Sequence, residues 1–372
     1  MKCKLSDICS FRKGKISVDG LNRSTYISTE NMLPNKCGIT EASSLPTVQL
    51  TQEYKKGDVL VSNIRPYFKK IWKATYDGGC SNDVLVFAAN SNTDKDFLYY
   101  ILANDDFFAY SMATSKGTKM PRGDKTSIMQ YEVPVMDIEL QRRIASILKS
   151  IDEKIELNNA INNNLEQQAQ ALFKKLFSDT TSDKNVTLGN VTTNIRERIG
   201  DGNAVVLSAV NTGKLQPSDE FFTKRVYSKD ISKYIIVREG TFAYNPARIN
   251  IGSIGINDLG ITGCVSPVYV VFSVDDEYQS FFEFYFKTET FRAEAMLRAS
   301  GSVRQSLNYS DFVLIKTQYP DRKTAKMFND FWLHQKSVIL QLKRENSRLE
   351  ELRDSLLPRL MSGELDVSDI DL

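Results

Sequence analysis

A long helical pattern occurs twice in this sequence, at a fixed distance. The segment "NLEQQAQALFKKLFS" begins at Asn164 and "RLEELRDSLLPRLMS" begins at Arg348, and each is rich in leucine and charge. The two segments are 184 residues apart in a chain of 372 residues. Because two units of this size are too few and too long for a solenoid, the spacing indicates an internal duplication.

The rest of each half repeats at nearly the same spacing. Gly57 and Gly240 each precede a short apolar run, and Cys80 and Cys264 each precede a strand-like stretch. Glycine-punctuated runs of β-branched and aromatic residues alternate with helical stretches and are followed by the long helix. We therefore predict an α+β fold in which two repeated globular α/β domains are separated by two long helices. The predicted boundaries are 1–137 and 179–320 for the globular domains, 138–178 and 321–361 for the helices, and 362–372 for a C-terminal tail.

Alternating steps of four and three residues along both helices select a mostly apolar series, which is typical of a coiled-coil seam. Two unrelated amphipathic helices are the alternative, but the runs share their phase and an asparagine at positions 162 and 346. Since each helix leaves its own globular domain, the connectivity predicts an antiparallel pair with pseudo-two-fold symmetry. The predicted seam comprises Ile144, Leu148, Ile151, Ile155, Asn158, Leu165, Leu172, Trp332, Ile339, Leu342, Asn346, Leu349 and Leu356.

The composition bears on the cellular location of the protein and on its cysteine chemistry. No window approaches 18 consecutive apolar residues, so no membrane span is expected, and the N-terminus lacks the apolar core of a signal peptide. The five cysteines are odd in number, widely scattered and free of CxxC pairs, which argues against a disulfide framework or a metal site. A reducing cytoplasm is the simplest location.

Catalytic motifs are missing from the sequence. The single histidine, His334, lies between two seam positions, and no Walker loop, GxSxG or HExxH motif occurs. The segment "NPAR" at 245–248 matches only part of the Asn-Pro-Pro-aromatic motif of adenine methyltransferases, and no glycine-rich cofactor loop accompanies it. We therefore expect no catalytic residue, no metal and no cofactor in this chain.

Several segments concentrate basic residues beside glycine and amide side chains. Lys and Arg neutralise phosphates, Arg suits bidentate reading of guanine, and Asn or Gln suits adenine. These segments predict contacts to DNA, although any single residue among them could equally be an ordinary surface charge. The candidates in the first half are Asn63, Arg65, Lys69, Lys70, Lys116, Lys119, Arg122 and Lys125. Those in the second half are Arg196, Arg198, Asn245, Arg248, Asn250, Ser253, Arg298, Ser302, Arg304 and Gln305.

Three segments also carry a family resemblance. The segments are "YEVPVMDIELQRRIASILKSIDEKIELNN", "LEELRDSLLPRLMSGELDV" and "YNPARINIGSIG". The first resembles the central conserved region of the specificity subunits of type I restriction-modification systems, and the second resembles their distal conserved region. The third resembles a stretch of their target-recognition domains, so the resemblance extends over the whole chain.

This resemblance implies a non-catalytic, sequence-specific DNA-binding subunit. Each target-recognition domain would read one half of a bipartite DNA site, and the coiled coil would set the spacer between the halves. The helices would also dock two methyltransferase (modification) subunits and the motor-nuclease (restriction) subunits. These partners, and not this chain, would use S-adenosylmethionine, ATP and Mg.

A coiled-coil adaptor without DNA, whose globular ends grip proteins, is the alternative. Its best support is the near-neutral formal charge of +2. Residues 1–137 contain 18 Lys plus Arg against 15 Asp plus Glu, and residues 186–320 contain 14 against 14. Any affinity of the chain alone for DNA should therefore be modest.

Overall fold

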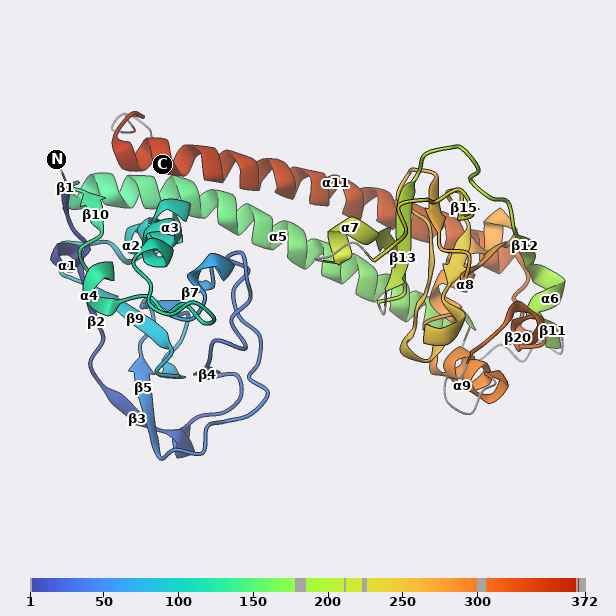
Figure 1. Cartoon of the computed structure of the whole chain (residues 1–372), viewed down its shortest axis with the longest axis horizontal. Coiled ribbons are helices and arrows are strands. Elements are labelled where there is room, and N and C mark those ends of the chain that lie inside the picture. Colours follow the sequence, from blue (N-terminus) through green and yellow to red (C-terminus); the bar gives the residue numbers. More distant parts are fainter. Residues whose placement is uncertain are drawn as a thin grey trace. The chain divides into compact units, whose positions relative to one another are not determined.

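The computed structural model describes residues 2–177, 185–210, 212–222, 226–299, 306–365 and 367. The chain divides into two compact units, of which the first comprises Met1–Asn159 with Lys343–Leu372 and the second comprises Ala160–Leu342. Each unit consists of one α+β region and parts of two long helices, α5 (Ile138–Phe177) and α11 (Arg322–Ser362) (Figure 1). The predicted fold class is confirmed. Ser362, which we assigned to the tail, is the last residue of α11, and Ser178 lies outside the described residues.

The first unit has short strands and helices before α5. Its elements are β1 (Lys2–Lys4), α1 (Leu5–Ile8), β2 (Cys9–Phe11), β3 (Lys15–Ser17), η1 (Val18–Gly20), β4 (Tyr26–Ile27), β5 (Leu50–Tyr54), β6 (Val59–Ser62), η2 (Pro66–Phe68), β7 (Ile71–Lys73), β8 (Gly78–Cys80), β9 (Val84–Ala89), α2 (Lys95–Ala103), α3 (Asp105–Ala113), α4 (Lys125–Ile128) and β10 (Glu132–Pro134). Helices α2 and α3 join the strands to α5 through one apolar core.

The second unit repeats this order. Its elements are β11 (Asn185–Thr187), α6 (Leu188–Val191), β12 (Thr193–Ile195), β13 (Val205–Val210), β14 (Lys214–Pro217), α7 (Ser218–Phe221), β15 (Ile235–Val237), β16 (Phe242–Tyr244), η3 (Pro246–Ile251), β17 (Ile254–Ile256), β18 (Gly263–Val265), β19 (Val270–Ser273), η4 (Asp276–Tyr278), α8 (Gln279–Tyr285), α9 (Glu289–Arg298), α10 (Tyr309–Phe312) and β20 (Lys316–Gln318).

Strand pairing shows that the two α+β regions are copies of one fold. The sheet β2-β9-β6-β7 corresponds to β12-β19-β16-β17, and the pair β1-β10 corresponds to β11-β20. In the remaining sheet, β8 lies parallel to β4 and antiparallel to β5, as β18 does to β13 and β15. The copies differ at one edge, because β3 extends the sheet beside β5 whereas β14 extends it beside β13.

A shared glycine explains part of this correspondence. Gly57 (φ 91°) and Gly240 (φ 77°) lie two residues before β6 and β16, in a left-handed conformation that glycine adopts without a Cβ clash. Val59 pairs with Phe87 of β9, and Phe242 pairs with Phe272 of β19, so the strands after both turns are in the same register. The register makes Asp58 and Thr241 equivalent positions.

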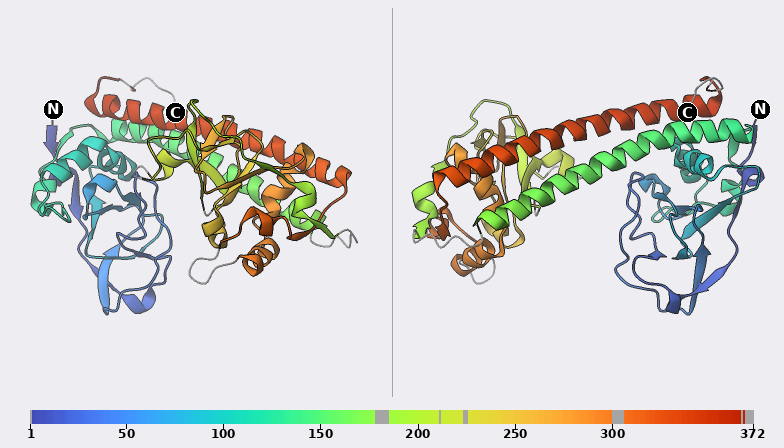
Figure 2. Two further views of the ribbon diagram at one scale, coloured as in Figure 1. Left: turned by 45° about the vertical axis from the view of Figure 1, so that its right-hand side comes forward. Right: turned by 180° about the vertical axis from the view of Figure 1, so that it is seen from behind.

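Within each unit, α5 and α11 pack with opposite chain directions (Figure 2). In the first unit Ile144 and Leu148 share a core with Leu357 and Leu360, and in the second unit Phe173 lies 5.6 Å from Phe328, between ring centroids. None of the predicted seam residues is exposed. Ile144, Leu148, Ile151, Ile155, Asn158, Trp332, Ile339 and Asn346 are buried, and Leu165, Leu172, Leu342, Leu349 and Leu356 are half-buried.

The buried asparagines of the first unit form a small polar layer in the seam. The Asn158 amide donates to the Asn346 carbonyl oxygen at 2.8 Å and to Glu345 at 2.9 Å, while the Asn346 amide donates to Asn159 at 2.9 Å. The prediction that Asn158 lies beside Asn346 is therefore confirmed. The Asn158 side-chain oxygen itself has no hydrogen-bond partner among the described residues, and the buried amide pair favours one register of the helices.

Replacing Asn158 alone by leucine is expected to lower the free energy of unfolding by about 1–3 kcal/mol, because the Asn346 oxygen loses its donor. Replacing both Asn158 and Asn346 by leucine should recover that loss, since an apolar layer needs no partner. Urea denaturation of the two single variants and the double variant gives the coupling energy. A coupling energy near zero would contradict this account of the layer.

Candidate nucleic-acid interface

The fold brings together the two basic segments that the sequence predicted in the first unit. The loop between β6 and β7 and the segment before α4 are joined by backbone hydrogen bonds, from Arg65 N to Pro121 O at 2.8 Å and from Gly123 N to Asn63 O at 3.1 Å. Arg122 also forms isolated bridges to Ile64 and to Lys116. We call these two joined segments, residues 63–70 and 116–125, the first basic surface.

Strained backbone fixes part of this surface. Arg65 (φ 52°) and Lys69 (φ 49°) flank η2 in the left-handed region, which costs free energy for residues with a Cβ. Asn35 and Lys36 also have positive φ and donate backbone hydrogen bonds to the carbonyl groups of Phe68 and Lys69 at 2.8 and 2.9 Å. Such strain persists only where neighbouring structure enforces it and is common at binding sites.

Carboxylates neutralise two of the cations in the first basic surface. Lys116 lies 2.6 Å from Asp124, and Arg122 lies 3.2 Å from Asp83. The hydrogen bond from Lys116, together with those from Ser127, lowers the pKa of Asp124 to about 2. Each of these two ion pairs is therefore neutral overall at neutral pH, although Lys116 and Arg122 keep their positive charge.

The neighbouring lysines differ in what they contact. Lys69 pairs with Asp105 at 2.7 Å, and Lys70 donates to the Thr29 carbonyl at 2.6 Å. Partial burial lowers the pKa of Lys70. Lys119 is exposed and has no carboxylate partner among the described residues, and Lys125 lies over the Phe11 ring, 5.9 Å from its centroid. Lys70, Lys119 and Lys125 are thus the lysines of this surface that have no carboxylate partner among the described residues.

Two buried polar atoms in the first basic surface have no hydrogen-bond partner among the residues that the structure describes. They are the side-chain oxygen of Asn63 and the Nε of Arg65. Native proteins pair nearly all such atoms, and the exceptions cluster at strained or functional places. Both residues were candidates from the sequence, and nothing in the structure tests whether they contact DNA.

In the second unit, some residues of the loop around η3 bond within the protein, and others are exposed to solvent. Asn245 caps η3 by accepting from the Ala247 backbone at 3.1 Å, and Ser253 is buried with its hydroxyl donating to the Ala209 carbonyl at 2.7 Å. These contacts correct our assignment of Ser253 to an accessible surface, because a fully buried hydroxyl is not presented to a ligand. Arg248 and Asn250 are exposed on the same loop.

The remaining candidates of the second unit lie around α9 and beyond it. Arg298 is half-buried at the end of α9, with its Nε 3.7 Å from Glu294. Ser302, Arg304 and Gln305 lie outside the described residues. Beyond them, the backbone amide of Leu307 donates to the carbonyl of Pro246 in η3 at 3.2 Å. The chain before α10 is therefore bonded to the η3 loop at Leu307, as the segment before α4 is bonded to the loop after β6.

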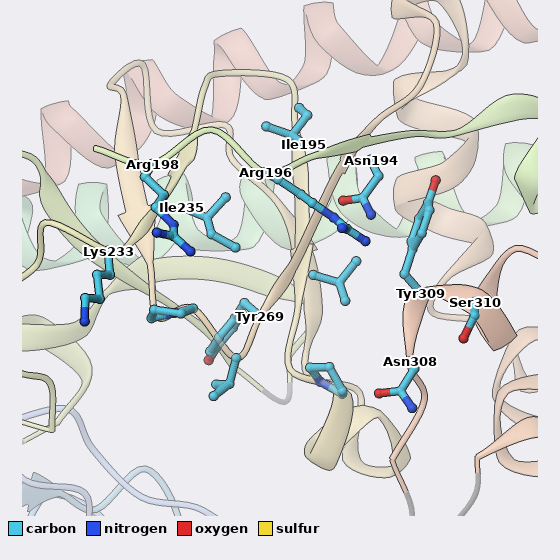
Figure 3. Close-up of a pocket in the computed structure, with 14 residues that line it drawn as sticks. Asn194, Ile195, Arg196, Arg198, Lys233, Ile235, Tyr269, Asn308, Tyr309 and Ser310 are labelled. Atoms are coloured by element: carbon cyan, nitrogen blue, oxygen red, sulfur yellow. The ribbon is translucent and has the colours of Figure 1, made fainter. Parts of the chain in front are cut away.

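A pocket of about 560 Å³ lies beside this loop, and we call it the cationic pocket (Figure 3). The candidates Arg196 and Arg198 line it, together with Lys233 from a distant segment. Its remaining lining residues are Asn194, Ile195, Ile235, Pro246, Pro267, Val268, Tyr269, Val270, Asn308, Tyr309 and Ser310. Sequence reasoning missed Lys233 and Asn308, because single polar residues from separate segments form no local pattern.

The first unit has a smaller hollow of about 50 Å³ in the corresponding place. In both units the lining residues come from the end of β2 or β12, from β5 or β15, from the chain leading into β9 or β19, and from the start of α4 or α10. The first hollow contains Phe11, Arg12, Gln52 and Lys125. Two copies of the fold thus present a hollow at the same site, with different size and lining.

Among the described residues, no group of three or more His, Cys, Asp or Glu could hold a metal ion. His334 is exposed on α11, as its place beside the seam predicted. No helix in the described ranges has the length and apolar character that crossing a membrane requires. Chemically, the loops of both units offer cations and amide groups, and the first basic surface adds strained backbone, which suits the binding of an anionic polymer.

Comparison with known proteins gives independent evidence on the family that this chain resembles. Residues 1–167 match the family described as Type I restriction modification DNA specificity domain. The chain is 34% identical over 163 residues to the Type I restriction enzyme HindI specificity subunit of Haemophilus influenzae, a match that covers 41% of this chain and 35% of that protein. It is 31% identical over 168 residues to the EcoDI specificity subunit of Escherichia coli, which covers 41% of this chain and 36% of that protein. The matches therefore span little more than a third of either relative.

Similarity of fold extends over nearly the whole chain. The crystal structure of the Type-I restriction-modification system S subunit from M. genitalium superposes with a TM-score of 0.59 at 16% sequence identity. The superposition covers 99% of this chain and 96% of that one. At this identity the likeness shows the fold alone.

Proposed function

We propose that the chain is a specificity subunit of a type I restriction-modification system and that it selects the DNA sequences on which such a complex acts, because residues 1–167 match that family and two relatives carry that name. Specificity subunits are non-catalytic, so this proposal includes that the chain itself is not an enzyme. To select a split DNA sequence, the chain would need one group of DNA-contacting residues in each of its two units.

The observation that carries this proposal is the duplicated basic surface. In each copy of the fold, the loop after β6 or β16 meets the segment before α4 or α10 through backbone hydrogen bonds. Arg65 lies on this loop in the first unit, and Arg248 lies on it in the second. We infer that each unit reads one half of a bipartite DNA site with these loops, since Arg and amide side chains discriminate bases in the major groove.

The long helices suit the other two tasks that we assign to the chain. With 40 residues in α5 and 41 in α11, their antiparallel pairing would set the spacer between the half-sites. Their outward faces would dock two methyltransferase subunits and the motor-nuclease subunits. We also propose that those partners, and not this chain, use S-adenosylmethionine, ATP and Mg, as the family resemblance implies.

Binding to duplex DNA by the chain assembled with modification subunits tests this function directly. We expect binding that prefers a split target over a scrambled duplex and that weakens steeply with added salt, as phosphate contacts release counterions. A coiled-coil adaptor that grips only proteins would assemble without such binding. Assembly without any duplex affinity at low salt would overturn the proposal.

Replacing Arg248 by alanine is expected to change the recognised bases in one half-site only, because the exposed guanidinium lies on the loop of one reader. Removing one bidentate interaction with a base costs about 1–3 kcal/mol of discrimination. Mapping of methylated sites from the variant complex measures the change. Arg292→Ala, which removes an exposed arginine on α9, should leave the motif as in the wild type.

A further inference from the structure

We propose that the cationic pocket of the second unit binds the phosphodiester backbone of duplex DNA through Arg196, Arg198 and Lys233. This inference rests on the proposed function, and it assigns to one pocket a part of the electrostatic affinity that the loops alone do not explain. The pocket lies against the η3 loop, since Pro246 is among its lining residues. A strand held there would pass beside Arg248, the exposed arginine of that loop.

None of the three cations of the pocket has an ion-pair partner among the described residues, although hydrogen bonds from Ser232 and the nearby Lys233 charge lower the pKa of Asp230. Arg196, Arg198 and Lys233 form no ion pair or side-chain hydrogen bond within the ranges that the structure describes, whereas Glu197 between the two arginines pairs with Arg238 at 2.6 Å. Three positive charges that line one concave surface repel one another and attract a polyanion. In contrast, Lys69, Lys116 and Arg122 of the first basic surface each have a carboxylate partner.

The walls of the pocket add neutral hydrogen-bonding groups. Figure 3 shows the Arg196 side chain extending toward Asn194, with Tyr309 and Asn308 on the far side. The Asn308 side chain does not cap α10, so its amide remains available for a ligand. The Tyr309 hydroxyl lies 3.2 Å from the Thr192 hydroxyl, which holds its ring as a fixed wall. Amide groups beside Arg and Lys are the usual donors to DNA phosphates.

The corresponding hollow of the first unit differs in its charge. There Arg12 is held by Asp58 in a two-point ion pair, with one nitrogen–oxygen distance of 2.7 Å. The sheet register places Thr241 at the position equivalent to Asp58, so the second copy has an uncharged residue where the first has a carboxylate. The hollow of the second unit is therefore larger, and it lacks the carboxylate that pairs with the arginine of the first hollow.

Phosphate explains these features better than a base does. A site that reads a base places one or two donors at fixed distances from the base edge. Three cations that line one pocket can instead neutralise phosphate charge without a precise hydrogen-bond geometry. Lys233 in particular offers a point charge, not a planar fork. We therefore expect the pocket to raise affinity for every duplex and to contribute nothing to the choice of bases.

The test is the salt dependence of duplex binding by the complex assembled with modification subunits. The variant Arg196→Ala/Arg198→Ala/Lys233→Ala should flatten the plot of log affinity against log salt by about 0.9 for each phosphate that the pocket no longer neutralises. The control variant Arg292→Ala/Lys229→Ala/Lys316→Ala removes the same charge from exposed positions of the same unit, outside the pocket and off the long helices. It should keep the wild-type slope, and both variants should keep the wild-type thermal midpoint.

A conservative variant separates phosphate binding from base reading. Arg196→Lys/Arg198→Lys keeps the charge and should keep both the salt slope and the methylated motif. A changed motif with an unchanged slope would overturn the phosphate assignment in favour of base contacts. An unchanged slope in the triple alanine variant, with wild-type binding intact, would also overturn it.

Two further results would count against the pocket as a DNA site. Inorganic phosphate or a mononucleotide could bind the wild-type chain without DNA and fail to bind the triple alanine variant, while the DNA slopes stay equal. That outcome would make the pocket a small-anion site. If the wild-type complex itself binds no duplex, the proposed function fails, and this inference fails with it.

Discussion

Replacing Glu283 by alanine is expected to lower the free energy of unfolding of the second unit by about 3 kcal/mol, because the buried Lys336 ammonium would keep only Asp258, at 2.8 Å, as a carboxylate partner. The Glu283 carboxylate lies on α8 and is 2.6 Å from Lys336 of α11, and it accepts a hydrogen bond from the Trp332 indole at 2.9 Å. Lys287 lies 3.4 Å from its other oxygen. This cluster joins the α+β region of the second unit to the long helix.

Chemical denaturation of the Glu283→Ala variant measures this loss. Glu289→Ala is a matched control, because Glu289 pairs with Arg292 at an exposed position and its removal should cost at most about 1 kcal/mol. Equal stabilities of the two variants would show that the buried cluster does not hold the unit together.

The pH dependence of this stability follows from the same contacts. Burial alone would raise the pKa of Glu283, but the ammonium groups of Lys336 and Lys287 and the hydrogen bonds from Lys336 and Trp332 outweigh it and lower the pKa. A lowered pKa in the folded state adds stability that is present above the unfolded value of about 4.3 and is lost as the pH falls through the folded value. The difference between wild type and Glu283→Gln should therefore shrink below about pH 4.

Removing one heptad from each long helix is expected to shorten the preferred DNA spacer while both half-sites stay the same. Deletion of residues 159–165 together with 339–345 keeps the seam in phase, because Asn158 lies against Asn346 and Leu165 packs in the same core as Ile339. Seven residues correspond to about 10 Å of helix. On duplex DNA this length corresponds to about three base pairs.

The measurement is methylation mapping of complexes assembled with the shortened chain. Duplicating the same two segments should lengthen the spacer instead, and Leu340→Ser, which alters an exposed position without changing the length, should leave it unchanged. If both length variants assemble and still mark the original spacer, the helices do not set the distance between half-sites.

The duplication and the seam could be predicted from the sequence because both depend on local patterns. Periodic apolar residues fix which face of a helix is buried, so the positions from Ile144 to Leu356 could be assigned without any long-range information. The fold class follows from the same patterns, since each half repeats its glycines and strand-like runs in one order.

Contacts between distant residues could not be predicted in this way. The heptad series of α11 also contains Arg353, a charged residue among apolar ones, and the structure places its guanidinium 2.8 Å from Asp152. Asp152 also accepts a hydrogen bond from Tyr100 at 2.7 Å, so a polar cluster joins α2, α5 and α11 in the first unit. Position 152 matches position 336 of the second half, where a lysine has the opposite charge.

The basic surfaces illustrate the same limit. Counting cations in sequence windows treated Lys69 and Lys119 alike, although Asp105 neutralises the first of them. Ion pairing depends on carboxylates that lie tens of residues away along the chain, so no window includes both partners. The cationic pocket was missed for the same reason. Lys233 and Arg196 are far apart in the sequence, and only the folded sheet brings them to the lining of one pocket.

Mapping of methylated bases across the genome of the host, with and without the gene for this chain, tests the central claim most directly. The account predicts a two-part motif, with specified bases on either side of a spacer of fixed length, that is methylated in the wild type and unmethylated in the deletion strain. Restoring the gene with Arg248→Ala should bring back methylation with one altered half. The same methylation pattern in both strains, or dependence on one contiguous motif, would contradict the claim that this chain reads a split DNA site.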